Sequence, residues 1–191
     1  VVNNNMIRAD CSFFFEIASD QNDAIKWLAT SSQLVIGTES AIFVMAASSN
    51  AAGQSVVMNG RHGSDLIQAT TVDRAIVYFA QGLRAVHEYY WNNQEEAFKS
   101  NNLAILAPHM LHDSAACDFD FMTNPYSRLL VTREDGQMSV LLYEKDFGVM
   151  AWTHVTLGGG AKIVSTAVTR GERGTDIIYM LVRRGETVTL E

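Results

Sequence analysis

Four residues near the middle of the chain have the chemistry of a metal site. Histidine nitrogen, aspartate oxygen and cysteine sulfur all bind zinc, and this segment supplies each of them: His109, His112, Asp113 and Cys117. Their spacing matches no closed four-ligand pattern, and no second pair of ligands follows. We therefore interpret the segment as a helix terminus with a hydrogen-bonded histidine, and we assign no metal and no cofactor.

A glycine-rich run has part of the composition of a phosphate-binding loop. Such a loop needs Gly-Lys-Ser/Thr at the start of a helix. Gly158, Gly159 and Gly160 are instead followed by Ala161 before Lys162 is reached. A strand-like stretch continues from that lysine, so the run predicts a flexible connection of a hairpin.

Two pairs of carboxylates are the remaining candidates for catalysis. Glu95 and Glu96 lie in a polar stretch. Asp118 and Asp120 share one face of a predicted strand, about 7 Å apart, and this distance alone does not exclude a glycosidase pair. No aromatic cleft is evident around them, and the sequence contains no Ser-His-Asp elbow, CxxC or GxGxxG motif. We favour a solvated strand face and predict that the protein is not an enzyme.

The three tryptophans separate into core and surface candidates. Trp27 and Trp152 lie inside apolar, strand-like stretches, which predicts that both are buried. Trp91 follows two tyrosines and precedes a polar stretch, so it is the best candidate for an exposed aromatic at a partner interface. The candidate interface residues are Tyr89, Tyr90 and Trp91.

Composition and charge limit the class of protein. The 191 residues are 48% hydrophobic and 18% charged, as in an ordinary globular domain. The net charge of −7 argues against a nucleic-acid-binding surface, which needs clustered Lys and Arg. It is compatible with a conduit past which DNA slides without specific binding, although general solubility is the simpler explanation. No apolar run is long enough to span a membrane.

The cysteines and the start of the chain give two further expectations. Cys11 and Cys117 do not make a disulfide framework, and a reducing compartment of synthesis fits best. The chain has no secretory signal and begins Val1-Val2-Asn3 without an initiator methionine. We expect it to be a piece of a longer protein.

Alternating apolar runs and turns predict antiparallel meanders. The first has apolar runs at 24–29, 33–38 and 41–45, separated by two turn-like stretches. Later hairpins are expected in three places: 75–79 with 83–90, 127–132 with 137–143, and 162–169 with 175–183. In the second of these, Asp135-Gly136 supplies the left-handed angles of a primed turn.

The segments outside these hairpins are predicted to be a strand, an irregular connection and a short helix. Residues 13–17 predict a strand, and residues 46–73 predict a long irregular connection with short β patches at 55–58 and 65–67. Near 101–111 we expect one short or kinked helix. Its N-cap is Asn101 or Asn102, and Pro108 prevents it from continuing as an α-helix.

The resulting fold prediction is all-β, built from antiparallel meanders with one short helix. Roughly thirteen strands at this turn spacing are typical of a sandwich, barrel or propeller. We favour a β-propeller-like arrangement, either a complete small propeller or part of one. The whole chain, 1–191, is expected to form a single β-rich domain.

The order of these motifs resembles that of short-tailed bacteriophage tail proteins. The family comprises the tail tubular (nozzle) proteins and the related tail-hub, or packaged-DNA stabilisation, proteins. The match covers residues 24–191, and its landmarks are Trp27-Leu28, Leu34 to Thr38, Ala75 to Phe79, Arg84 to Glu88, Tyr89-Tyr90, Asn102-Leu103, His109 to Leu111, Asp135-Gly136, Ala151 to His154, and Val182 to Arg184. Two departures mark a distant member. Asn102 stands where the family often has Asp, and the proline often found before the second hairpin is absent at Gln68-Ala69-Thr70.

The resemblance implies a structural role. It implies that the full-length protein forms a ring, expected to be six-fold, below the portal on the axis through which DNA leaves the capsid. The ring would contact itself and neighbouring tail or portal proteins, connect tail parts, and help to retain or conduct DNA. The implied location is the virion tail, of a free phage or a prophage, after assembly in the host cytoplasm. We place the contact patches in 46–73 and 89–98.

Two alternative functions remain open from the sequence. One is a propeller-type binding module for a host-surface glycan or protein, which would present a shallow aromatic face without carboxylates. The other, less favoured, is a glycoside hydrolase, which would present exposed aromatics beside paired carboxylates.

Overall fold

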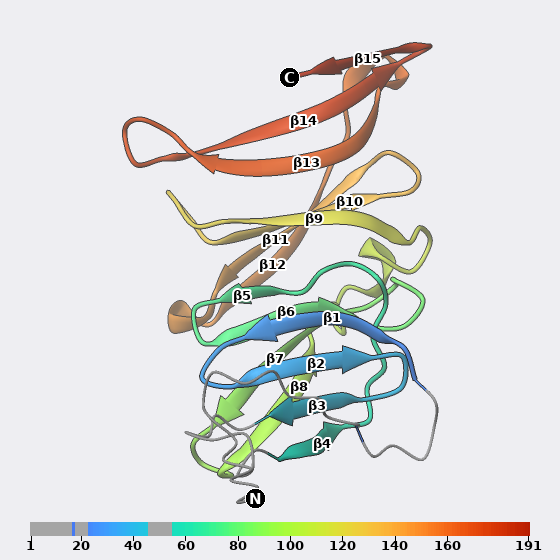
Figure 1. Cartoon of the computed structure of the whole chain (residues 1–191). Helices are drawn as coiled ribbons and strands as arrows, with labels where there is room; N and C mark the ends of the chain where they lie inside the picture. Colours follow the sequence, from blue (N-terminus) through green and yellow to red (C-terminus); the bar gives the residue numbers. More distant parts are fainter. Residues whose placement is uncertain (1–16, 18–22, 46–54) are drawn as a thin grey trace, which may run out of the picture.

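The chain folds into antiparallel β-sheets (Figure 1). The computed structural model describes residue 17, residues 23–45 and residues 55–191. Fifteen strands and three 3-10 helices lie in these residues, and no α-helix does. The predicted all-β class is therefore confirmed.

The strands make four meanders, which we call the first to fourth sheets. The first sheet contains β1 (Ile25–Thr30), β2 (Leu34–Thr38), β3 (Ile42–Met45) and β4 (Val56–Gly60). The second contains β5 (Thr70–Val72), β6 (Ala75–Phe79), β7 (Val86–Asn92) and β8 (Ala97–Asn102). The third contains β9 (Ala116–Met122), β10 (Arg128–Arg133), β11 (Met138–Glu144) and β12 (Val149–Val155). The fourth contains β13 (Lys162–Arg170), β14 (Asp176–Arg184) and β15 (Thr187–Leu190).

Consecutive sheets stack face to face. The first strands of neighbouring sheets lie together, since β1 contacts β5, β5 contacts β9, and β9 contacts β13. Figure 1 shows the stack running from the blue first sheet to the red fourth sheet. The first and fourth sheets lie at opposite ends, so the stack does not close on itself.

The apolar core is divided among the interfaces between sheets. Trp27, Val35 and Ile42 of the first sheet pack with Ile76 and Tyr78 of the second. Between the second and third sheets the core includes Val77, Phe79, Leu129, Val131 and Leu141. Between the third and fourth it includes Leu130, Met138, Val140 and Ile163. Central strands such as β6 carry apolar residues on both faces because a sheet lies on each side of them.

The two predicted core tryptophans lie at these interfaces. Trp27 is 2% exposed and confirms the prediction. Trp152 is half-buried against the core between the second and third sheets, and its indole N–H donates to the carbonyl of Leu103 at 2.9 Å. Trp152 therefore also links the third sheet to the turn that follows the second.

The expected helix near 101–111 is reduced to turns. Asn102 ends strand β8, and the segment continues through turns to the 3-10 helix η2 (Pro108–Met110). The Asn102 side chain accepts the N–H of Ala104 at 2.8 Å, so it caps a turn rather than a helix. Pro108 has no N–H and begins a new single turn, which explains why no α-helix forms. The other 3-10 helices are η3 (Lys145–Phe147) and η4 (Gly158–Gly160), the latter at the predicted glycine-rich connection.

The turn between β10 and β11 differs from the predicted primed turn. Gly136 has a left-handed φ of +85°, but Asp135 does not have a positive φ. The N–H of Gly136 donates to the carbonyl of Arg133, and the N–H of Arg133 donates to the carbonyl of Gln137. This pattern is a β-turn followed by a glycine bulge. The hairpin and its position were predicted correctly, and its turn type was wrong.

The stretch 46–73 is more regular than predicted where it is described. It contains β4, an isolated bridge between Ser64 and Ala80, and β5, whereas no strand forms at 65–67. The remaining part, 46–54, lies outside the described residues. The strand predicted at 13–17 also lies outside them except for Ile17, which is not in a strand.

Aspartates hold the fourth sheet to the third. Asp118 accepts the Ser165 hydroxyl at 2.6 Å, and Asp120 accepts the backbone N–H of Val168 at 2.6 Å. Asp176 accepts the N–H groups of Thr123 and Asn124. These backbone bonds lower the pKa of Asp176 below its ordinary value. The favoured interpretation of Asp118 and Asp120 as a solvated strand face is wrong, because both carboxylates bind the adjoining sheet.

Candidate interaction surfaces

The predicted interface residues lie on β7 and point into different environments. Tyr89 is 2% exposed and stacks on Phe98, with ring centroids 5.0 Å apart. Tyr90 is half-buried, and the ammonium of Lys145 lies 4.2 Å from its ring centroid. Trp91 is 47% exposed and meets Phe98 edge to face. Tyr89 and Trp91 share one face of β7, and Tyr90 lies on the other. On the shared face Tyr89 is buried in the core between the first and second sheets, whereas Trp91, near the end of the strand, remains exposed.

A hollow of about 540 Å³ lies beside Trp91. Trp91 and Phe98 provide its aromatic wall, and polar residues from two turns provide the rest. These polar residues are Thr30, Ser31, Ser32, Thr71, Asp73 and Arg74. Asp73, in the β5–β6 turn that lines the hollow, has a left-handed φ of +53°. In such a hollow the aromatic wall can pack against the flat face of a polar ligand, while the hydroxyl and charged side chains bond its polar groups.

The outer face of the fourth sheet is apolar and uncovered. Ile177, Tyr179 and Leu181 alternate along β14 on this face and are 40–43% exposed. On β15, Leu190 lies opposite Leu181 and is 66% exposed. The intervening residues Ile178, Met180 and Val182 face the third sheet. Strand β14 therefore has the composition of a strand buried on both faces, yet only one face is covered.

A buried carboxylate lies between the second and third sheets. Glu88 on β7 is 2% exposed. Its carboxylate accepts a hydrogen bond from the Tyr143 hydroxyl at 2.5 Å and forms an ion pair with the ammonium of Lys145 at 2.8 Å. Burial, followed by the bond to Glu88, raises the pKa of Tyr143 well above its ordinary value. The arrangement satisfies a buried charge and so stabilises the sheet interface rather than forming a reactive pair.

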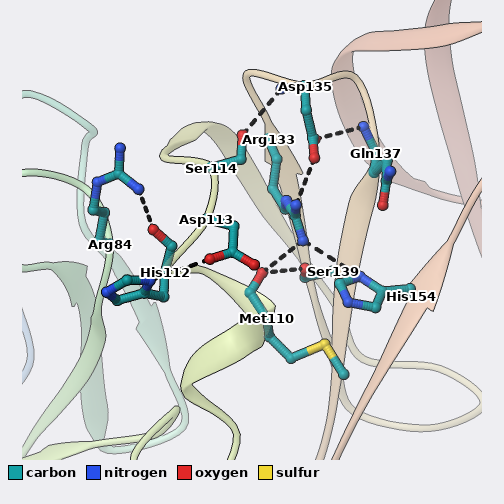
Figure 2. Close-up of polar contacts among 10 residues, drawn as sticks. All are labelled: Arg84, Met110, His112, Asp113, Ser114, Arg133, Asp135, Gln137, Ser139 and His154. Atoms are coloured by element: carbon teal, nitrogen blue, oxygen red, sulfur yellow. Dashed lines mark hydrogen bonds and ion pairs between the residues drawn. The ribbon is translucent and has the colours of Figure 1, made fainter.

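A second polar cluster surrounds Arg133 at the end of β10 (Figure 2). The guanidinium is buried and donates to the carbonyl of Met110 at 3.0 Å and to Asp135 at 2.5 Å. The Ser139 hydroxyl donates to the same carbonyl of Met110. The Arg133 guanidinium also lies 3.5 Å from Nδ1 of His154, whose pKa is lowered by desolvation and then by the charge of Arg133. Arg133 thus fixes the segment around η2 on the third sheet.

The four residues with metal-binding chemistry, to which the sequence analysis assigned no metal, are not brought together. His112 and Asp113 bond each other at the surface, and Figure 2 shows them beside the Arg133 cluster. His109 instead lies against His154, with ring centroids 6.3 Å apart. Cys117 points to the carbonyl of Thr132. Among the residues that the structure describes, no group of three or more His, Cys, Asp or Glu side chains could hold a metal ion.

The remaining sequence candidates have structural roles. Glu95 pairs with Lys99 at 2.6 Å on the surface of the β7–β8 hairpin, and Glu96 has a positive φ in its turn. Gly159 and Gly160 also have positive φ values in the β12–β13 connection. In the described part of the chain, no helix is long and apolar enough to cross a membrane.

Sequence reasoning missed Glu88, Arg133 and the outer face of the fourth sheet. The partners of Glu88 and Arg133 are 55 and 23 residues away in the chain, at Tyr143 and Met110, so no local motif marks them. A signal for the outer face does exist. The uninterrupted apolar run 177–182 is typical of a strand covered on both faces.

The chain was compared with known proteins. No protein-family model matches it, and no curated protein gives a significant match.

Proposed function

We propose that the chain is a structural, non-enzymatic component of a short-tailed phage tail, part of a nozzle or hub ring below the portal. In this proposal its sheets belong to a propeller-like scaffold, and the ring joins tail parts and helps to retain or conduct DNA without binding it specifically. The ordered set of tail-protein landmarks along 24–191 supports this proposal. The protein would act in the virion tail after assembly in the host cytoplasm.

The observation that carries the proposal is the uncovered face of β14. Each described interface between sheets buries an apolar row from both sides, and Ile177, Tyr179 and Leu181 form such a row without a partner. A further sheet on this face would extend the stack in the manner of its three internal interfaces. Ring assembly needs two different complementary patches on each subunit, and this face supplies one of them.

The charge of the fourth sheet differs in sign from that of the whole chain, which is consistent with contact between this sheet and an acidic surface of another subunit. In residues 162–191 Lys and Arg outnumber Asp and Glu by one, whereas the whole chain has a net charge of −7. The fourth sheet would therefore meet an acidic surface of another subunit without repulsion. Trp91, with Tyr90 beside it, is our candidate for the second patch.

Light scattering and negative-stain imaging of the full-length protein test the proposal. We expect a ring for the full-length protein and a monomer or weak association for the 191-residue chain. Tyr179→Glu and Trp91→Glu should each weaken the ring and leave the subunit folded, because both side chains are exposed. Tyr126→Glu is the matched control, since Tyr126 is 55% exposed and lies outside both patches. A full-length protein that never forms a ring would overturn the proposal.

The hollow beside Trp91 favours a second candidate function, the binding of a host-surface glycan. A sugar ring could lie against the indole while its hydroxyls bond Asp73 and Arg74. A glycan array probed with the protein tests this function. Binding should be lost in Trp91→Ala and retained in Trp91→Phe. Binding that survives Trp91→Ala, or no binding to any glycan, would exclude this candidate.

A further inference from the structure

A cavity of about 490 Å³ lies between the third and fourth sheets. Strand β13 packs on β9 and β10, where the two sheets are closest. Toward the other side, the cavity separates β10, β11 and β12 from Ile178 and Met180 of β14. The space is left because the sheets meet at their first strands and diverge beyond them.

The walls of this cavity are almost entirely apolar. Leu130, Val140 and Leu142 line it from the third sheet, as does Met138, and Met180 lines it from the fourth. Methionine side chains adapt to irregular apolar ligands. Pockets of this size and composition, with few polar groups, are typical of small-molecule sites.

Arg128 is the one charged residue among the cavity's lining residues. It is half-buried on β10, and it also lines an adjoining hollow of about 520 Å³ with Tyr126, Phe147 and Glu144. Its guanidinium lies 5.5 Å from the ring centroid of Tyr126. No ion pair of Arg128 occurs within the described residues. The carboxylate of Glu144 instead accepts the N–H of Ser127 at 2.8 Å.

We propose that this cavity binds a long-chain carboxylate, with the head on Arg128 and the alkyl chain between the sheets. The apolar wall along β11 from Leu142 to Met138 extends about 13 Å, which accommodates a substantial part of such a chain. The guanidinium matches a carboxylate in charge and in its two-pronged hydrogen-bonding geometry. The inference goes beyond the proposed function and does not depend on it.

Quenching of tryptophan fluorescence by a brominated long-chain carboxylate tests the proposal on the intact chain. Trp152 is among the lining residues of the cavity, and its indole packs on the other face of the same sheet, so bromine bound in the cavity lies one sheet thickness away and should quench it in a saturable manner. The quenchable signal should disappear in Trp152→Phe. Affinity should rise about fourfold for each methylene added while the chain still fits the cavity.

Two variants test the two parts of the site. Arg128→Gln should weaken carboxylate binding about tenfold and leave binding of the alcohol of the same chain length unchanged. Ala151→Phe should block both ligands, because Ala151 is an exposed lining residue whose enlargement fills the cavity without disturbing the core. Ala167→Phe, on an exposed residue of β13 outside the cavity, is the matched control.

Several results would overturn the proposal. Equal affinities for the carboxylate and the alcohol, or an unchanged affinity in Arg128→Gln, would remove Arg128 from the site. Absence of saturable quenching would show that no such chain enters the cavity. Self-association of the chain that Ala151→Phe abolishes would show that a second copy covers the cavity instead.

Discussion

The Tyr143 hydroxyl donates a hydrogen bond to the buried carboxylate of Glu88 across the interface between the second and third sheets, at 2.5 Å. Glu88 lies on β7 and Tyr143 on β11, and Lys145 completes the contact from the adjoining η3 turn. A buried carboxylate is stable only when its oxygens are bonded. This contact therefore holds two sheets in one relative position.

Tyr143→Phe should lower the free energy of unfolding by about 1–3 kcal/mol, because it leaves one bond of a buried carboxylate unmade. Denaturant titration measures the change. Tyr126→Phe, at an exposed tyrosine, is the control and should have no effect beyond error. A Tyr143→Phe midpoint equal to that of the wild type would mean that the bond contributes nothing to stability.

Trp27→Ala should lower the free energy of unfolding by about 3–5 kcal/mol, since it leaves a cavity in the core between the first and second sheets. Denaturant titration measures this change, and an unmoved midpoint would contradict it.

Gly37→Ala should also be strongly destabilising, because a Cβ at Gly37 would overlap the indole ring of Trp27. A smaller residue at 27 should relieve part of this overlap. Additive effects of Gly37→Ala and Trp27→Leu in a double-mutant cycle would contradict the predicted contact.

Stability should fall as the pH drops below about 6.5. Burial, and then the charge of His62, lowers the pKa of His87 to about 4 from its ordinary value of 6.5. The unfolded chain therefore binds a proton over this range that the folded chain does not, and the slope from His87 is at most about 1.4 kcal/mol per pH unit. The loss of stability that His87 causes should level off below pH 4.

Unfolding of His87→Asn measured from pH 7 to pH 4 checks this prediction. The variant should show a shallower decline than the wild type, whatever its stability at pH 7. His62→Gln removes one source of the shift at an exposed residue, so it should reduce the pH dependence slightly. Parallel pH profiles for the wild type and His87→Asn would refute the assignment.

Asp120→Ala should loosen β13 from the third sheet. It removes the acceptor of the Val168 N–H, which would then lack its partner on the edge of the fourth sheet. Hydrogen exchange should accelerate at Val168 and remain unchanged at Val140, inside the third sheet. The isosteric Asp120→Asn retains an acceptor oxygen and should have a smaller effect. Unaltered exchange at Val168 in Asp120→Ala would show that another group protects it.

The sequence by itself determined most of the strands, the order of the meanders, the burial of Trp27 and the exposure of Trp91. Strands such as β6 and β14 are marked by apolar runs, and their hairpin partners are near in the chain, so local pattern and turn residues are sufficient. Trp27 is buried, and Trp91 is exposed, as predicted.

Only the tertiary structure decided how the sheets meet and which polar groups join them. The sequence predicted a helix near 101–111, but contacts of this segment with the third sheet, together with Pro108, leave turns and one 3-10 helix. Asp118 and Asp120 looked solvated because their partners on β13 lie 47 and 48 residues away. Neither charge nor spacing along one strand reports such a partner, since the two groups come together only when whole sheets stack.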